Sequence, residues 1–330
     1  MKEFGYQRAD DISGAVALLG TDPDARFLGG GTNLVDLMKS GVERPGLLVD
    51  VRRLPLDRVE STPDGGLRIG ATVTNSDLAV HPEVRRRYPV LTQAVLAGAS
   101  GQLRNMATVG GNLLQRTRCG YFTDVTKACN KREPGSGCPA IEGEHHNHAI
   151  LGASDHCVAT HPSDMGVALT ALDAVVTYET ADGPGELPLA DFYLPVGDTP
   201  HRETALPPGA LITGVIVPPA PVAARSRYRK VRERASYAFA IGSVAAALDV
   251  SDGVVREVRL AFGAVASRPW RARAAERALT GAPADAENFA AAADAELAAA
   301  RPLRDNSYKV TLMRNLVVAV LTELAEEATR

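Results

Sequence analysis

The chain has 330 residues, which is enough for about two domains and a sizeable hydrophobic core. Its composition is 45% hydrophobic and 23% charged with a net charge of −3, which argues against a dedicated nucleic-acid binder because such proteins carry a basic excess. No apolar run has the length of a membrane span, and the N-terminal residues include acids where a signal peptide needs an apolar core, so we expect neither a membrane span nor an export signal in this chain.

The first hundred residues predict alternating helices and strands. Apolar residues recur at helical spacing in some segments, and short apolar runs bounded by Gly or Pro indicate strands in others. In chain order we expect a helix over 10–20, a strand over 25–28, a helix over 32–41, a strand over 46–54, a hairpin over 56–74 and a long helical stretch over 76–100.

The second half of the chain predicts a different mixture of elements. Helical spacing returns at 163–174 and is followed by a strand over 174–180. A proline-rich stretch at 217–222 is the expected boundary between domains, so that residues 1–220 and 221–330 form separate units. Beyond it we expect antiparallel strands over 228–250 and 253–265 and amphipathic helices over 286–300 and 308–328.

All four cysteines lie within residues 116–160, a segment rich in Gly, Pro, Lys, Asn and His without sustained periodicity. A long loop of this kind in a compact domain is usually functional or disordered. The spacings C-x9-C, C-x8-C and C-x18-C lack the short knuckles of zinc ribbons, whereas four thiolates are the usual ligands of a [4Fe–4S] cluster. The candidate ligands are Cys119, Cys129, Cys138 and Cys157.

Two other chemistries for the cysteines stay open at this point. An even number of cysteines permits two disulfides, although disulfides are more typical of small exported domains. A mixed Cys/His zinc site is also possible in composition, because five of the seven histidines lie in or near the segment: His145, His146, His148, His156 and His161. The flanking Arg116, Arg118, Lys127, Lys131 and Arg132 would offset the charge of thiolates.

Two short glycine segments resemble one another, GGGTN at 29–33 and TVGGN at 108–112. Consecutive glycines allow the backbone to approach a ligand closely and to direct its N–H groups toward a phosphate, and a helix start behind the loop adds partial positive charge. Two such nests suit the pyrophosphate of a dinucleotide, although each segment alone is also compatible with a tight turn. The candidate binding residues are Gly29, Gly30, Gly31, Thr32, Asn33, Thr108, Gly110, Gly111 and Asn112.

Four segments of the chain resemble the flavin subunit of the molybdenum hydroxylases, the xanthine dehydrogenase and carbon monoxide dehydrogenase family. Two of them contain the glycine segments, FLGGGTNLVDLMKSG and ATVGGNL, and the other two are HPSDMGVALTALDA and YRKVRERASYAFAIGSVAAAL. The resemblance implies an α+β fold in which a two-subdomain PCMH-type FAD-binding domain precedes a smaller C-terminal domain of antiparallel sheet and helices. It implies that the glycine segments hold FAD, that Asp164 accepts hydrogen bonds from flavin hydroxyls and that Lys230 lies beside the flavin ring. For Asp164 a helix-capping role is the alternative, and for Lys230 a solvated position on a strand.

The cysteine-bearing insertion at about 116–160 is similar to the flavin subunit of periplasmic aldehyde oxidoreductases, which implies a [4Fe–4S] cluster on the four cysteines. The implied function is electron transfer within a molybdenum-dependent aldehyde oxidoreductase. A large subunit would hold the molybdenum cofactor, a small subunit the [2Fe–2S] clusters, and FAD in this chain would pass electrons to an external acceptor. No side chain here is then expected to act as a catalytic acid, base or nucleophile.

A zinc-stapled binding module and a stand-alone FAD oxidase are the alternative functions. Because the chain is expected to lack its own signal, it is either exported to the periplasm with a signal-bearing partner or stays in the cytoplasm.

Overall fold

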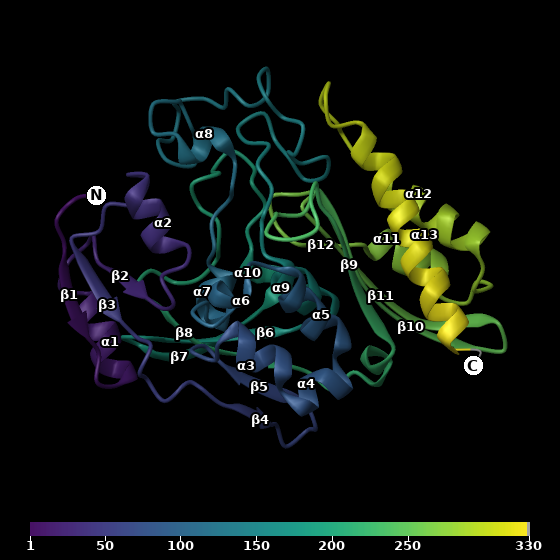
Figure 1. Cartoon of the computed structure of the whole chain (residues 1–330), viewed down its shortest axis with the longest axis horizontal. Helices are drawn as coiled ribbons and strands as arrows, with labels where there is room; N and C mark the ends of the chain where they lie inside the picture. The colour runs from purple at the N-terminus through teal and green to yellow at the C-terminus, as the bar shows by residue number, and fades with distance from the viewer. Residues whose placement is uncertain (329–330) are drawn as a thin grey trace.

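A computed structural model describes residues 1–328 and contains three β-sheets within them (Figure 1). A small sheet lies at the N-terminal end, a five-stranded sheet in the middle and a four-stranded sheet at the C-terminal end. Strands and helices mix within each part, so the fold is α+β, as the sequence predicted.

The N-terminal sheet is parallel, with the order β1-β3-β2. Its strands are β1 (Gly5–Arg8), β2 (Arg26–Leu28) and β3 (Leu47–Asp50), and helices α1 (Ile12–Leu19) and α2 (Leu34–Lys39) connect them. The Asp11 carboxylate caps α1 by accepting a hydrogen bond from the Gly14 N–H at 2.6 Å. Strand β1 is exposed along its length, which explains why no apolar pattern indicated it in the sequence.

The middle sheet is antiparallel, with the order β4-β5-β8-β6-β7. Its strands are β4 (Val59–Ser61), β5 (Leu67–Gly70), β6 (Val175–Thr180), β7 (Gly183–Pro188) and β8 (Leu211–Val217). The predicted hairpin is therefore present as β4 and β5. One hydrophobic core joins this sheet to the N-terminal sheet, since Ala15 of α1, Val49 of β3 and Val215 of β8 belong to the same buried cluster.

The sequence pattern over 76–100 suggested one long helical stretch, but the structure divides it into separate helices. It forms α3 (Asn75–Val80), α4 (Pro82–Arg87) and α5 (Pro89–Ala97), and a proline occupies the first turn of each of the last two. Proline has no N–H to donate and clashes with the preceding turn, so each proline ends one helix and begins the next. The remaining helices of the first domain outside the insertion are α6 (Gly101–Arg104), α7 (Val109–Leu113), α9 (Asp164–Ala171) and α10 (Leu189–Phe192).

The C-terminal sheet is antiparallel, with the order β12-β11-β10-β9. A short 3-10 helix, η1 (Pro221–Ala224), leads into the strands β9 (Ser226–Val231), β10 (Gly242–Ser251), β11 (Val254–Gly263) and β12 (Trp270–Arg271). Helices α11 (Arg273–Leu279), α12 (Ala286–Leu297) and α13 (Tyr308–Ala328) follow, and α12 packs against α13.

Both faces of this sheet are covered. Successive side chains of a strand point to opposite faces, and in β10 Val244 and Ala246 belong to the core beneath α13, whereas Ala245 between them belongs to the core of the first domain. Helices α5 and α9 of the first domain contact this second face. The C-terminal sheet is therefore shared by both hydrophobic cores.

The segment 116–160 runs along the top of the molecule in Figure 1 and contains one short helix, α8 (Gly120–Thr123). Its far end is anchored to the C-terminal domain, because the N–H groups of Ile150 and Leu151 both donate to the Val265 carbonyl at 2.9 Å. The Lys309 ammonium of α13 is fully buried and donates to the carbonyls of Asn147, His148 and Ala264 at 3.2, 3.0 and 2.6 Å. One amine thus ties the insertion to both α13 and the end of β11.

We predict that Lys309→Met destabilises the C-terminal domain by about 2 kcal/mol, because it removes the buried amine that donates to three carbonyls. Trp270 is the only tryptophan of the chain and lies in this domain, so its fluorescence during urea unfolding measures the effect. Arg314→Met is the matched control on the same helix, since Arg314 is exposed and its pair with Asp294 is expected to contribute little. Equal midpoints for the two variants would contradict the prediction.

Candidate functional site

The two glycine segments lie against one another. A β-carbon at Gly30 would lie 1.8 Å from the Met106 carbonyl oxygen, and one at Gly29 would lie 2.8 Å from the Thr108 hydroxyl oxygen. Real side chains do not approach backbone atoms so closely, so glycine at position 30 is required by the packing of the chain itself. The first segment follows β2 and the second leads into α7, and this contact brings the two together.

The first segment has the free donors that an anion site needs. In the described part of the chain, none of the N–H groups of residues 29–33 hydrogen-bonds to another group of the chain. Asn33 lies at the start of α2, where its Oδ1 accepts from the Arg116 N–H at 2.9 Å. Its Nδ2 is buried and has no partner among the described residues. These donors fit a bound phosphate group.

The second segment differs from its expected form, because it is largely a turn of helix rather than an open nest. The Thr108 hydroxyl caps α7 by accepting from the Gly111 N–H at 3.3 Å. The Gly110 N–H donates to the Ala71 carbonyl at 2.9 Å, and the Asn112 N–H to the Thr108 carbonyl at 2.8 Å. The N–H groups expected to converge on phosphate are therefore used by the protein, while the Asn112 side chain accepts from the Ser163 hydroxyl at 2.6 Å.

Asp164 and Lys230, predicted independently, form an ion pair of 2.8 Å between Nζ and Oδ2. The Asp164 side chain is 9% exposed and that of Lys230 is 4% exposed, so the alternative of a solvated strand lysine is wrong. The helix-capping alternative for Asp164 is also wrong, since Ser163 caps α9 by accepting from the Gly166 N–H at 2.8 Å. Tyr228 donates its hydroxyl hydrogen to the other Asp164 oxygen at 2.5 Å.

Tyr228 was missed in the sequence analysis, although strand periodicity offered a signal. It lies two residues before Lys230 on β9, so both side chains point to the same face of the sheet. Burial, together with the adjacent Asp164 carboxylate, raises the pKa of Tyr228 well above its ordinary value, so the phenol stays a hydrogen-bond donor.

Asp164 also lines a small pocket that contains Arg118 and Phe239, with the Arg118 guanidinium 4.8 Å from the centre of the Phe239 ring.

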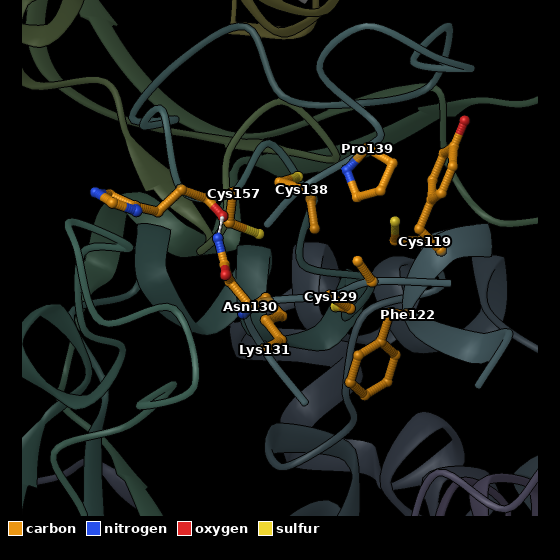
Figure 2. A pocket seen from close by; sticks show the side chains of 12 residues that line it. Cys119, Phe122, Cys129, Asn130, Lys131, Cys138, Pro139 and Cys157 are labelled. Carbon is orange, nitrogen blue, oxygen red and sulfur yellow. Dashed lines mark hydrogen bonds between the residues drawn. The ribbon is translucent and has the colours of Figure 1, made fainter. Parts of the chain in front are cut away.

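The four cysteines line one common pocket within the insertion (Figure 2). They come from separate positions: Cys119 immediately before α8, Cys129 and Cys138 in the loop after it, and Cys157 just before the chain returns to α9. All four are free thiols, so the two-disulfide alternative is wrong. Four cysteines around one pocket supply the number of thiolates that a [4Fe–4S] cluster takes as ligands.

Two of the thiols interact directly. The interaction with Cys157 lowers the pKa of Cys138 to about 7, and the interaction with Cys138, together with burial, raises the pKa of Cys157. Burial raises the pKa of Cys119. Among residues 1–328, no three His, Cys, Asp or Glu side chains converge closely enough to hold a single metal ion.

The basic residues that flank the cysteines are mostly paired with acids. Arg116 pairs with Glu43 and with Glu203, both at 2.6 Å, and Lys131 pairs with Glu203 at 2.8 Å. Lys131 is buried and lines the cysteine pocket, so its charge lies near the sulfurs. Glu203 was missed in the sequence analysis because it lies in an irregular segment 46 residues beyond Cys157 and no local pattern marks it.

His148 is the histidine that contacts a cysteine sulfur. Its Nε2 lies 3.2 Å from the Cys119 sulfur. Burial, assisted by the nearby Lys309 charge, lowers the pKa of His148 to about 4, so the imidazole is neutral at physiological pH. The other histidines near the insertion make different contacts: His145 hydrogen-bonds to the Ala140 carbonyl and His146 stacks on Tyr308.

Comparisons with known proteins agree with this arrangement. Residues 2–220 match the family model of the FAD binding domain in molybdopterin dehydrogenase, and residues 226–324 match the CO dehydrogenase flavoprotein C-terminal domain. The chain is 51% identical over 329 residues to the aldehyde oxidoreductase FAD-binding subunit PaoB of Escherichia coli strain K12, covering 99% of this chain and 100% of that protein. It is 26% identical to the glyceraldehyde dehydrogenase medium chain of Sulfolobus acidocaldarius, covering 84% of this chain and 82% of the relative.

Solved structures share the fold over the full length. Carbon monoxide dehydrogenase from Hydrogenophaga pseudoflava matches with a TM-score of 0.76 at 27% identity, covering 99% of this chain and 98% of that one. Quinoline 2-oxidoreductase from Pseudomonas putida 86 matches with a TM-score of 0.77 at 23% identity, covering 100% of both chains. The predicted α+β architecture is thereby confirmed, and the chain belongs to the family of FAD-binding subunits of the molybdenum hydroxylases.

Proposed function

We propose that this chain is the electron-transfer subunit of a molybdenum-dependent aldehyde oxidoreductase and that it holds both FAD and a [4Fe–4S] cluster. Electrons from [2Fe–2S] clusters in a small partner subunit reach FAD, which delivers them to an external acceptor, while a large partner subunit carries the molybdenum cofactor. The observation that supports this most directly is the full-length similarity to an aldehyde oxidoreductase subunit in a chain whose four thiols share one pocket. A bound flavin supplies the coupling between one-electron donors and a two-electron acceptor.

The flavin is proposed to bind along the two packed glycine segments. The free N–H groups of residues 29–33 and the unpartnered Asn33 Nδ2 would hold the pyrophosphate. Thr108, Gly110, Gly111 and Asn112 would form the adjoining wall, and the Asp164–Lys230 pair would lie at the flavin end and accept or donate hydrogen bonds there. We place the boundary between the two domains after residue 220, where the FAD-domain match also ends.

The cluster is proposed to bind to Cys119, Cys129, Cys138 and Cys157. Each iron of such a cluster takes one thiolate, so its ligands surround a cube instead of meeting at one ion. The common pocket suits that arrangement better than the zinc-stapled alternative, which needs three or four ligands around a single ion. A stand-alone FAD oxidase would give the four cysteines no role.

The chain is proposed to reach the periplasm only when carried by a signal-bearing partner, and to stay in the cytoplasm otherwise. No helix among residues 1–328 combines the length and apolarity that crossing a membrane requires.

We predict that Asn33→Asp lowers FAD affinity by roughly 10- to 100-fold. The change keeps the oxygen that accepts from the Arg116 N–H, but it replaces the free Nδ2 donor with a negative oxygen facing a phosphate. FAD titration of flavin-depleted protein, followed by flavin fluorescence, measures the affinity. Asn288→Asp, which makes the same charge change in the first turn of α12 in the other domain, is the control. A folded Asn33→Asp protein with unchanged affinity would remove Asn33 from the proposed site.

We predict that Cys138→Ser lowers iron and acid-labile sulfide from about four of each per FAD, the content of one [4Fe–4S] cluster, while FAD is largely retained. The chain has no other cysteine to replace the missing ligand. The order of residues 116–160 is expected to depend on the cluster, so limited proteolysis should cut this segment faster in the variant. Thr126→Ser, a conservative change at an exposed position of the same segment, is the control. Stoichiometric zinc without labile sulfide in the unsubstituted protein would refute the cluster.

We predict that the chain expressed without partner subunits stays in the cytoplasm and moves to the periplasm when its partners are co-expressed. Cell fractionation with immunodetection measures this, using a cytoplasmic marker enzyme as the control. Recovery of the chain alone from the periplasm would contradict transport by a partner.

A further inference from the structure

We propose that His148 donates a hydrogen bond from its ring Nε2 to the Cys119 thiolate and thereby raises the reduction potential of the cluster held by the four cysteines. This inference rests on the proposed [4Fe–4S] cluster and assigns His148 a positioning and tuning role in it.

The geometry of the imidazole identifies Nε2 as the donor. Nε2 lies 3.2 Å from the Cys119 sulfur, which is hydrogen-bonding distance for an N–H to a sulfur acceptor. The other ring nitrogen, Nδ1, is buried and has no partner among residues 1–328. A neutral imidazole carries one N–H, and a ligating thiolate can only accept. The tautomer with hydrogen on Nε2 satisfies the thiolate, whereas the other tautomer would direct its N–H at no acceptor and its lone pair at the sulfur.

The position of the ring is set by the protein around it. The His148 carbonyl accepts from the Lys309 ammonium at 3.0 Å and from the Asn306 side-chain amide at 3.3 Å, and both donors are fully buried. The His148 N–H donates to the His145 carbonyl at 3.0 Å. The backbone at this position is therefore fixed from the side of α13, so the imidazole is directed at Cys119 by the C-terminal domain.

The neighbouring histidines do not duplicate this contact. Both ring nitrogens of His145 are engaged elsewhere, Nδ1 with the Ala140 carbonyl and Nε2 with the Asp305 N–H. His146 is exposed and stacks on Tyr308. In the described structure, His148 is therefore the histidine of the insertion whose imidazole hydrogen-bonds to a cysteine sulfur.

The electrostatic consequence follows from the sign of the charge change. When the cluster gains one electron, negative charge on its sulfurs increases, and an N–H that points at a sulfur stabilises the reduced form more than the oxidised form. Loss of the imidazole N–H therefore lowers the reduction potential.

The test compares His148→Leu, His148→Gln and His146→Leu in the complete complex. The leucine removes the donor, the glutamine can supply an amide N–H near the same place, and His146→Leu alters a histidine of the same segment that does not touch sulfur. Iron, sulfide and FAD are quantified first, and the cluster potential is then measured by dithionite titration followed by electron paramagnetic resonance. We expect His148→Leu to lose about tenfold in the reduction equilibrium constant, which is about 59 mV for one electron. His148→Gln is expected to recover part of that loss, and His146→Leu to match the unsubstituted protein.

The outcomes separate this inference from the proposed function. Iron and sulfide in the unsubstituted complex that do not exceed the content of the partner's [2Fe–2S] clusters would overturn the [4Fe–4S] cluster and this inference together. A full cluster with the same potential in His148→Leu would overturn the role of His148 alone. If His148→Leu does not assemble the cluster, ¹⁵N-histidine labelling provides the second measurement. The reduced cluster of the unsubstituted protein should show a weak ¹⁵N coupling that is absent from His148→Gln, and a coupling that persists in His148→Gln would refute the assignment.

Discussion

The structure depends on the pairing of charges that are removed from water. An isolated buried charge is strongly unfavourable, so a buried ion is stabilised by a counterion or by hydrogen bonds, wherever these lie in the sequence. Arg116 joins Glu43 of the N-terminal region to Glu203, and Glu203 in turn holds Lys131 beside the cysteine pocket. Asp164 and Lys230 similarly connect the start of α9 to β9 across the domain boundary. Removing Asp164 or Lys230 would leave the other residue buried without its counterion, and the Arg116 network supplies further pairs, so these ion pairs help to fix where the insertion and the C-terminal sheet lie on the FAD domain.

The glycine segments show how structural and binding requirements coincide. Glycine at position 30 is enforced by the Met106 carbonyl, which would collide with any β-carbon there, so this residue is needed whether or not a ligand is present. The neighbouring N–H groups are left without acceptors, and that is the property a phosphate would use. A glycine motif can therefore mark the contact between two loops, with the binding surface lying beside that contact.

Much of the fold was predictable because its signals are local. The apolar patterns of β10, β11 and α13 indicated their elements, and Asp164, Lys230 and the four cysteines were all found as candidates. The proline breaks before α4 and α5 were readable in principle but were outweighed by the helical spacing around them. The sequence could not show which residues that are distant along the chain come into contact. The pairing of Asp164 with Lys230, the position of Glu203 and the contact of His148 with Cys119 all depend on how irregular segments fold against parts of the chain far away in sequence. The helical form of 108–112 was missed for a related reason, since it depends on bonds to Ala71 and Val73.

The coverage of the C-terminal sheet on both faces has a mechanical consequence. A domain whose sheet is solvated on one side can swing about its linker, but β10 lies within two cores at once, and separating the domains would expose apolar side chains from each. Rigid-body rotation between the two domains is therefore costly. The cysteine pocket, which is anchored to the C-terminal domain, and the glycine segments of the first domain consequently keep a constant separation.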